Sequence, residues 1–361
     1  MTIDFGWFLP TMGDSEVIGP PTREPTLDYL TEVARAAEDA GFVFALVPVG
    51  TTCEDAWIAS AMVAARTEKL KFLVAMRPGF VAPTLAAKMA TTYDQLTRGR
   101  VLINVVTGGF PAELAADGDF TEHDERYVRT QEFMQVVRRA WTEKKWNHEG
   151  TYFRVEEGNV FPRPFQQPYP PFYFGGASDA AKKVGAEETD VYLLWGEPLD
   201  MVRERIADMR ERAAAAGRTL RFGLRIHVVV RETDDEARAA AEHLIAHIPD
   251  RFKDMMDRHM SGSDSEGEKR QRMLREQEWL SPHLWSGIGK ARLGVGTALV
   301  GSGESVAARL QEYVDEGIDT FILSGYPHRE EAQRFGTYVM PHFAGKASVA
   351  APSRELTASS A

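Results

Sequence analysis

The sequence of 361 residues contains a single cysteine, Cys53. One thiol excludes a disulfide within the chain and any metal site built from several thiolates. The sequence also lacks runs of lysine and arginine, and its formal net charge is −11. We therefore expect no nucleic acid and no anionic membrane surface among its partners, because both bind through clustered positive charge.

Long hydrophobic runs are also missing. No apolar stretch approaches the roughly 20 residues that a membrane-spanning helix needs. The first residues, MTIDFGWFLPTMGD, carry an acid and no basic stretch, whereas secretory signals begin with positive charge. Together with the single thiol, these features predict a cytoplasmic protein.

Several common nucleotide-binding and hydrolase motifs do not occur. The sequence has no G-x-G-x-x-G after its first predicted strand, no Walker motif and no G-x-S-x-G. This argues against the usual dinucleotide, NTPase and serine-hydrolase sites. Among the nine histidines, His243 and His247 have i, i+4 spacing but no third ligand beside them, so no metal site is predicted.

The sequence does contain an alternation of strand-like and helix-like segments that repeats eight times. The strand-like apolar runs cover residues 3–9, 42–49, 70–76, 100–108, 170–178, 190–197, 220–230 and 319–327. Each is followed by a segment with helical periodicity, the seventh at 234–248. Eight such units with mostly short connections favour an α/β fold of the closed (β/α)₈ type, a TIM barrel, over an open eight-stranded sheet.

Two stretches depart from this alternation. Residues 150–170 are typical of a short hairpin and a Pro-rich connector before the fifth strand, and residues 250 to about 302 separate the seventh helix from the eighth strand. An insertion after a late strand lies on the catalytic face of a barrel, where it can act as a lid. We predict one domain over residues 1–343 and an Ala/Ser-rich tail, 344–361, that is disordered or forms an arm between subunits.

Polar or reactive side chains follow almost every predicted strand. Barrel enzymes place their chemistry at these C-terminal strand ends. The residues concerned are Thr11 and Met12, Cys53, Arg77, Asn104 and Thr107, Trp195 and Glu197, Arg225 and His227, and Tyr326 and His328.

Arg225 and His227 are the most informative of these residues. They stand two apart in the apolar run RFGLRIHVVV, so in a strand both side chains point to the same face. An unpaired buried arginine is costly, so either a carboxylate on a neighbouring strand pairs with it or the two side chains line a cavity that receives an anion.

Three other positions allow two interpretations each. Cys53 is either a small buried residue or a thiol whose pKa is lowered by the start of a helix. Tyr127 either belongs to the first turns of a helix or reaches a ligand at the barrel mouth. The turn FGGAS at 174–178 is either an ordinary tight turn or a phosphate site at a helix N-terminus.

Ten segments, taken in order, resemble the flavin-dependent alkanesulfonate monooxygenases of the bacterial-luciferase-like superfamily. The resemblance covers nearly the whole chain up to about residue 343. The segments are WFLPT, CEDAW, KFLVAMRPG, NVVTG, ERY, QQPYPPFYFGGASD, WGEP, RFGLRIHVVVRETDDEA, GTALVG and IDTFILSGYPH.

This resemblance implies a (β/α)₈ barrel that has no reductase of its own. A separate NAD(P)H-dependent FMN reductase supplies reduced FMN, and the enzyme uses it with O₂ to cleave the C–S bond of a sulfonate, giving an aldehyde and sulfite. Family members are usually homodimers or homotetramers. Because a sulfonate is a permanent anion, its pocket needs guanidinium groups, which keep their charge.

The resemblance also implies roles for individual residues. Arg225, His227, Tyr326 and Arg292 match active-site positions, with Arg292 supplied by the inserted lid. Cys53, Trp195 and Met12 match the wall of the substrate pocket, together with Arg225 and Arg292. Asn104, Thr107, Tyr127, Gly176 and Ser178 match positions that bind the flavin ring and phosphate.

Met12 is a departure from the family pattern, which has histidine after FLPT. A thioether cannot replace imidazole in acid–base chemistry. The substrate can therefore differ from a linear alkanesulfonate, and a sulfosugar such as sulfoquinovose is one alternative. A related monooxygenase acting on a sulfone, and a barrel that binds a flavin or deazaflavin without oxygen chemistry, are the other two.

Overall fold

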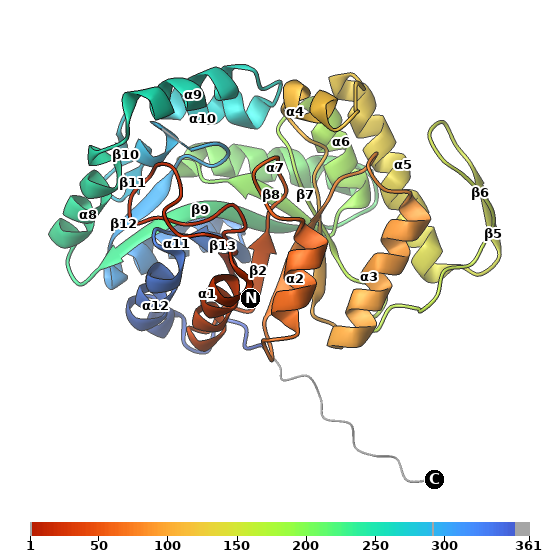
Figure 1. The fold of residues 1–361 in the computed structure, drawn as a ribbon, viewed down its shortest axis with the longest axis horizontal. Coiled ribbons are helices and arrows are strands. Elements are labelled where there is room, and N and C mark those ends of the chain that lie inside the picture. Colours follow the sequence, from red (N-terminus) through yellow and green to blue (C-terminus); the bar gives the residue numbers. More distant parts are fainter. Residues whose placement is uncertain (1, 291, 351–361) are drawn as a thin grey trace, which may run out of the picture.

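The computed structural model describes residues 2–290 and 292–350 and shows a closed parallel β-barrel surrounded by helices (Figure 1). Neighbouring barrel strands follow one another in the chain, and the last strand pairs with the first. The barrel strands are β1 (Asp4–Phe8), β2 (Phe44–Val47), β3 (Lys71–Met76), β4 (Val101–Val105), β7 (Phe172–Gly175), β8 (Val191–Trp195), β9 (Arg221–Arg231) and β13 (Thr320–Ser324). The predicted TIM barrel is confirmed.

Apolar side chains fill the lower part of the barrel. Because side chains alternate along a strand, every second residue points inward. The interior cluster contains Val43, Phe44, Leu73, Leu102, Tyr173, Val191 and Ile322. Gly6 leaves room for this packing, since a Cβ atom there would lie 2.2 Å from the ring of Phe44. The interior is a packed core, which leaves the C-terminal rim for polar chemistry.

Eight helices form the outer ring. They are α1 (Leu27–Asp39), α2 (Ala56–Ala64), α3 (Pro83–Thr97), α5 (His123–Thr142), α6 (Asp179–Glu188), α7 (Leu199–Ala215), α11 (Gly303–Glu316) and α12 (His328–Tyr338). The ring position between α7 and α12 is filled by α11, which packs against both. The helix at 234–248, counted from the sequence as the seventh of the alternation, therefore lies outside the ring.

The cause is the length of β9. This strand has eleven residues, whereas the other barrel strands have four to six. Residues 221–225 pair with β8, but residues 227–231 pair with an additional parallel strand, β12 (Ala298–Ser302). The second half of β9 thus rises above the rim, with Arg225 and His227 at the level where β8 ends and β12 begins.

The inserted segment lies above the barrel mouth (Figure 1). It lies between β9 and the ring helix α11, and not between the seventh ring helix and the eighth strand as the sequence indicated, and it begins earlier than residue 250. It comprises α8 (Asp234–Ala246), α9 (Asp250–Ser261), α10 (Glu266–Leu274), β10 (Trp279–Ser281), β11 (Leu284–Trp285), the 3₁₀ helix η1 (Gly287–Lys290) and β12. It reaches the far side of the mouth, where the Ser263 hydroxyl donates to the Gly109 carbonyl at 2.6 Å and Arg126 pairs with Asp264 at 2.6 Å. The insertion is therefore docked across the rim.

The remaining elements lie at the edges of the molecule. The expected hairpin is present as β5 (Trp146–Glu149) and β6 (Arg154–Gly158), slightly earlier than the sequence indicated, and projects beyond α5 in Figure 1. The short helices are α4 (Pro111–Ala116) and η2 (Met340–Phe343). The predicted tail begins against the barrel, since the Ile3 N–H donates to the Lys346 carbonyl at 2.9 Å. The rest of it, 351–361, lies outside the described residues.

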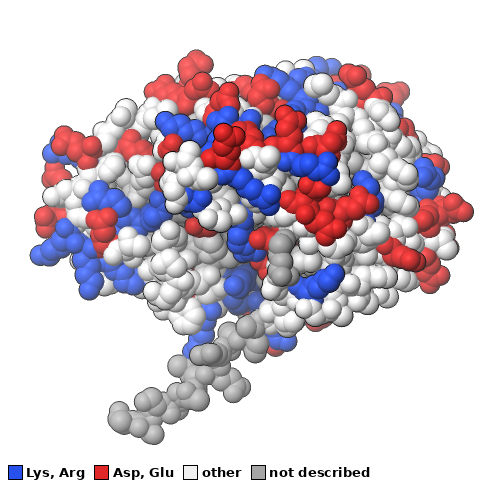
Figure 2. Space-filling model, turned by 180° about the vertical axis from the view of Figure 1, so that it is seen from behind, with Lys and Arg blue, Asp and Glu red and all other residues white. Residues whose placement is uncertain are grey.

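Acidic and basic side chains are interspersed on the face shown in Figure 2. Many of them pair locally, as Arg203 of α7 does with Glu316 of α11. In the described part of the chain, no helix is both long and apolar enough to cross a membrane.

Candidate active site

Arg225 projects from β9 at the C-terminal rim of the barrel and is only 6 % exposed. Its guanidinium donates to the carbonyls of Ile226 (3.0 Å) and Ile322 (3.3 Å) and to the hydroxyl of Ser324 (2.7 Å). Burial, together with the positive charge of Arg292, lowers the pKa of Arg225 well below its ordinary value. The site thus holds a cation under strong desolvation.

His227 shares the Ser324 hydroxyl with Arg225. The Nδ1 atom of His227 lies 2.7 Å from that oxygen. Burial first, and then the charges of Arg225 and Arg292, lower the pKa of His227 well below its ordinary value, so the ring is neutral. A guanidinium only donates, so Ser324 accepts from Arg225 and can direct its own proton to Nδ1. The proton of the imidazole then resides on Nε2.

The Nε2 atom of His227 is buried and makes no hydrogen bond of ordinary geometry with the described residues. The ring stacks on Tyr326, with centroids 6.0 Å apart. The Val295 backbone acts on this ring and raises the pKa of His227 against the larger effect of burial. A better-aligned acceptor on a bound ligand would complete the hydrogen bonding of this N–H.

Tyr326 and the insertion meet at Arg292. The Nε atom of Arg292 donates to the Tyr326 hydroxyl at 2.7 Å, and Nη1 donates to the Leu293 carbonyl at 2.8 Å. The guanidinium lies 5.5 Å from the centroid of the Phe8 ring, and that of Arg225 lies 5.0 Å from the same centroid. Two cations, one from the barrel and one from the insertion, therefore share a single aromatic ring.

Neither of these two arginines has an acidic partner among the residues that the structure describes. Their polar contacts go to backbone carbonyls and to the hydroxyls of Ser324 and Tyr326, and no carboxylate within residues 2–290 and 292–350 forms an ion pair with either. By contrast, Arg77 at the end of β3 pairs with Glu113 at 3.1 Å. The interpretation of Arg225 as half of a structural salt bridge is therefore not supported.

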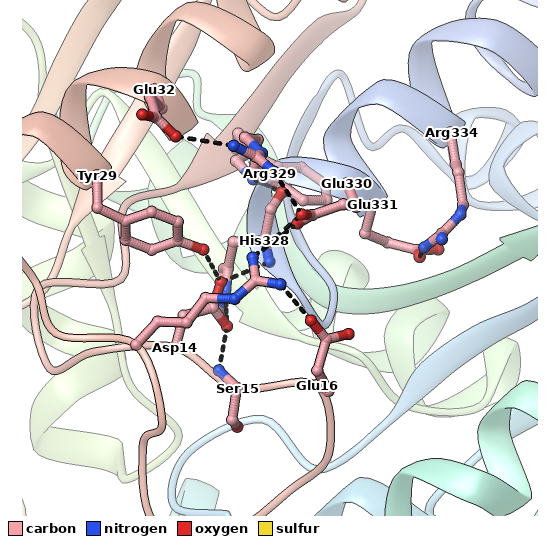
Figure 3. Close-up of polar contacts among 12 residues, drawn as sticks. Asp14, Ser15, Glu16, Tyr29, Glu32, His328, Arg329, Glu330, Glu331 and Arg334 are labelled. Atoms are coloured by element: carbon pink, nitrogen blue, oxygen red, sulfur yellow. Dashed lines mark hydrogen bonds and ion pairs between the residues drawn. The ribbon is translucent and has the colours of Figure 1, made fainter.

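A buried hydrogen-bonded pair, Asp14 and His328, anchors the loop that follows β1. Figure 3 shows Tyr29 and His328 pointing at Asp14. Asp14 accepts from the His328 backbone N–H and from its Nδ1, both at 2.8 Å, and from the Tyr29 hydroxyl. Burial acts to raise the pKa of Asp14, but the charge and hydrogen bonds of His328, with the Tyr29 hydrogen bond, outweigh it and hold the pKa at about 2.

This pair positions Tyr326, because His328 follows it by two residues and its ring packs edge-on against the tyrosine at 5.0 Å. Nε2 of His328, like that of His227, is buried without a hydrogen-bond partner among the described residues. Two imidazole edges without partners thus flank the tyrosine ring.

Three other residues expected at the pocket wall lie at strand ends and are half-buried: Met12, Cys53 and Trp195. Burial raises the pKa of the Cys53 thiol, although Thr11 and Arg292 act against this. The thiol is therefore protonated at neutral pH, and the interpretation as a reactive thiolate is not supported. Trp195 touches the insertion, since a Cβ atom at Gly267 would lie 3.1 Å from its ring.

The five residues expected at the flavin lie on the opposite side of the barrel from β13. Gly176 and Ser178 form the turn from β7 into α6, and the Ser178 hydroxyl accepts from the Ala181 N–H at 3.2 Å as the helix N-cap. A Cβ atom at Gly176 would lie 3.6 Å from the Tyr127 hydroxyl, and burial raises the pKa of that tyrosine.

Asn104 and Thr107 belong to the same side. Thr107 Oγ1 lies 3.1 Å from the hydroxyl of Thr130 on α5. The Asn104 side chain is half-buried at the rim and has no hydrogen bond to the described part of the protein. The two predicted groups, anion-binding and flavin-binding, thus occupy different arcs of one rim.

Four participants were missed or left without a role by sequence reasoning. Phe8 and Ser324 look like ordinary strand residues, although the register places Ser324 opposite His227. Asp14 and His328 are far apart in the chain, and their pairing gives no local signal. The described residues contain no cluster of three or more potential metal ligands.

Comparisons with known proteins agree with this architecture. A model of the luciferase-like monooxygenase family matches residues 3–320. A riboflavin lyase, RcaE, solved with modified FMN and riboflavin, has a TM-score of 0.82 at 21 % identity, covering 98 % of this chain and 94 % of that one. DmoA from Hyphomicrobium sulfonivorans gives 0.80 at 22 % identity, covering 96 % and 90 %.

EDTA monooxygenase, EmoA, from Chelativorans sp. BNC1 gives a TM-score of 0.78 at 19 % identity, covering 98 % of this chain and 96 % of that one. At these identities the likeness to solved structures shows the fold. A shared fold does not identify the substrate, which depends on the side chains at the rim of the barrel.

Proposed function

The chain belongs to the luciferase-like monooxygenase family, and from this premise we propose that it uses reduced FMN and O₂ to cleave the C–S bond of an organosulfonate. In the balanced reaction one oxygen atom of O₂ becomes the aldehyde oxygen and the other leaves as water. Reduced FMN supplies two electrons, and the sulfur departs as hydrogen sulfite.

The observation that carries this proposal is the pair of unneutralised cations. Arg225 and Arg292 both approach the ring of Phe8, and neither is paired with a carboxylate in the described part of the chain. A desolvated guanidinium pair binds a permanent anion strongly, with each charge-assisted contact contributing about 1.5–3 kcal/mol. A sulfonate meets this demand because it stays ionised at every physiological pH.

The neighbouring side chains have separate tasks. His227 presents the N–H of Nε2, which can donate to an oxygen of the substrate, while Ser324 holds the ring in that tautomer. Tyr326 fixes Arg292 through its hydroxyl. The docked insertion excludes water from the rim.

The chemistry of the other arc fits FMN. The N-terminus of α6 offers backbone N–H groups to a phosphate, beside Ser178 and Tyr127. Asn104 offers an unused amide to a polar ring edge, next to Thr107. When bound, reduced FMN would be the group that reacts with O₂.

Met12 favours a second candidate substrate. Its half-buried thioether stands where the family pattern has histidine, so the pocket wall differs there in polarity and shape. A sulfosugar such as sulfoquinovose therefore belongs in any substrate test beside linear and aromatic sulfonates, together with a sulfone as the non-sulfonate arm.

The decisive experiment supplies reduced FMN through a generic reductase and measures sulfite release from this panel. Sulfite from at least one sulfonate is expected, and the active member identifies the class. If reduced FMN binds but no sulfonate yields sulfite, the proposal is wrong.

We also propose an NAD(P)H-dependent FMN reductase as partner and a homodimer or homotetramer as the assembly. Support for the assembly comes from exposed apolar side chains on two adjacent ring helices, Ile58 (65 %) and Met62 (49 %) on α2 and Leu85 (52 %) and Leu96 (82 %) on α3. Light scattering after size exclusion tests it, and a mass of 40.2 kDa, that of one chain, would contradict it.

A further inference from the structure

Glu268 is a buried carboxylate in the middle of the insertion. It lies on α10, is 2 % exposed, and accepts the N–H of Gly294 at 2.7 Å through Oε1. Its second oxygen, Oε2, is buried without a hydrogen-bond partner among the described residues. Such an acceptor is costly unless a nearby positive charge compensates it.

The positive charge near Glu268 comes from three arginines, one of which, Arg292, belongs to the anion site. Glu268 and Arg292 line one small cavity, together with Arg272 and Arg275 of the α10 segment. Arg275 is neutralised by Asp257 of α9 at 2.9 Å. Arg292 forms no ion pair with any described residue. The acid that lines the cavity with it is Glu268.

Helix α10 also holds the backbone that carries Arg292. Besides the bond from Gly294 to Glu268, the Gly296 N–H donates to Gln271 Oε1 at 2.9 Å. From this segment Arg292 reaches Tyr326. A change at Glu268 therefore acts on Arg292 both through the backbone and through charge.

We propose that Glu268 is a positioning residue that holds the Arg292 segment in place and sets how strongly Arg292 attracts an anion. This inference rests on the proposed function, in which Arg292 binds a sulfonate. An ionised Glu268 offsets part of the positive field at the rim, whereas a protonated Glu268 leaves that field intact.

The charge of Glu268 changes near neutral pH. Burial raises its pKa to about 7, against the opposing effects of the Gly294 N–H and of Arg292, Arg272 and Arg275. On the far side of Arg292, the pKa of His227 is lowered and that of Cys53 is raised. These two groups therefore stay neutral around pH 7, whereas the charge of Glu268 changes there. His328 faces Tyr326 at 5.0 Å between ring centroids and is common to the wild type and to a Glu268 variant, so the difference between their pH profiles isolates Glu268.

The test is equilibrium binding without flavin, using inorganic sulfate and 1-octanesulfonate as probes and tryptophan fluorescence as the signal. Both probes keep a constant charge between pH 6 and 8.5. The Kd of the wild type should rise about three- to ten-fold over this range as Glu268 ionises. Glu268→Gln keeps an acceptor for Gly294 and should hold the low Kd throughout.

The matched control is Glu276→Gln, which removes the same charge from an exposed position just beyond α10. It should follow the wild-type profile. A wild-type Kd that is independent of pH, or a Glu268→Gln profile with the wild-type slope, would overturn the inference. If the variant does not fold, a wild-type Kd that is independent of pH still overturns the inference.

A second measurement separates this inference from the proposed function. If neither probe binds the wild type at any pH, anion binding at the rim is wrong and the function falls with it. Glu268 can still be judged by Tm. Its pKa is about 7 in the folded protein against 4.5 ordinarily, so the wild type should lose stability relative to Glu268→Gln as pH rises from 4.5 to 7. A constant Tm difference overturns the inference.

Discussion

The two arginines of the candidate site come from regions built in different ways. Arg225 stands on a barrel strand with neighbours on both sides, and its guanidinium is held by two backbone carbonyls and one hydroxyl. Arg292 stands on the insertion and contacts the barrel wall through the Tyr326 hydroxyl and the ring of Phe8.

Arg225 is therefore a fixed cation, whereas the position of Arg292 depends on how the insertion docks on the barrel. The strand cannot move without breaking the barrel, so Arg225 is present whether or not the insertion is in place. Arg292 is in position only while α10 and the segment behind it remain seated. Substitutions on the barrel wall should therefore act on chemistry or stability, and substitutions on the insertion should act on affinity.

The largest effect is expected from Arg225→Met. Methionine keeps much of the side-chain volume but removes the cation, so kcat/KM for the sulfonate should fall about 100-fold or more. Because the removed charge was buried without an acidic partner, Tm should stay equal or rise. Steady-state sulfite release and thermal unfolding measure the two effects.

Arg203→Met is the matched control, since its side chain is exposed and pairs with Glu316 on the surface. It should change neither quantity appreciably. A fall in Tm for Arg225→Met with activity retained would show that Arg225 stabilises the fold and is not the fixed cation of the anion site.

Asp14→Asn should produce the next largest effect, on stability. The pKa of Asp14 is lowered from 3.8 to about 2 in the folded protein, which corresponds to roughly 2 kcal/mol of stabilisation. A lowered pKa stabilises above pH 3.8, and this stabilisation is lost as pH falls through 2. The variant should unfold more easily at pH 6 and match the wild type near pH 2. A difference that persists at pH 2 would mean that the carboxylate charge is not its source.

Arg292→Gln should weaken substrate binding without affecting the barrel. We expect KM to rise about ten-fold, with kcat changing less and Tm unchanged, because a single charge-assisted contact is lost from the insertion. If kcat falls as far as it does for Arg225→Met, the two arginines contribute equally to the reaction, and the proposed difference between Arg225 and Arg292 is wrong.

Asp264→Ala tests docking itself and should have the smallest effect. Its carboxylate pairs with Arg126 at 2.6 Å at the far end of the insertion. The Arg292 segment retains other ties, because the Thr297 hydroxyl still donates to the Gly196 carbonyl at 2.8 Å. We expect a KM about three-fold higher and faster proteolysis within residues 250–275. Unchanged proteolysis would show that this ion pair does not hold the insertion down.

The fold was predictable because its signals are local. Apolar runs of strand length alternate with helical periodicity eight times, and each run reports its own structure. The role of the helix at 234–248 was not predictable in this way. Its periodicity resembles that of a ring helix, but the eleven-residue length of β9 carries it above the rim.

The candidate site was predictable in part. Strand ends indicated Arg225, His227 and Tyr326, and resemblance indicated Arg292 and the flavin residues. Ser324, Phe8 and the Asp14–His328 pair join the site through contacts that no local pattern announces. Glu268 is buried, and no local pattern in the sequence indicates this.

The sequence by itself determined the order of the eight barrel strands, because each apolar run reports its own structure. It also determined the shared face of Arg225 and His227, because side chains alternate along one strand. Only the tertiary structure decided that Arg225 has no carboxylate partner in the described part of the chain and that one hydroxyl joins it to His227. Ser324 lies 99 residues from Arg225 and 97 from His227 along the chain. Such contacts depend on the register between distant strands, which the closed barrel sets.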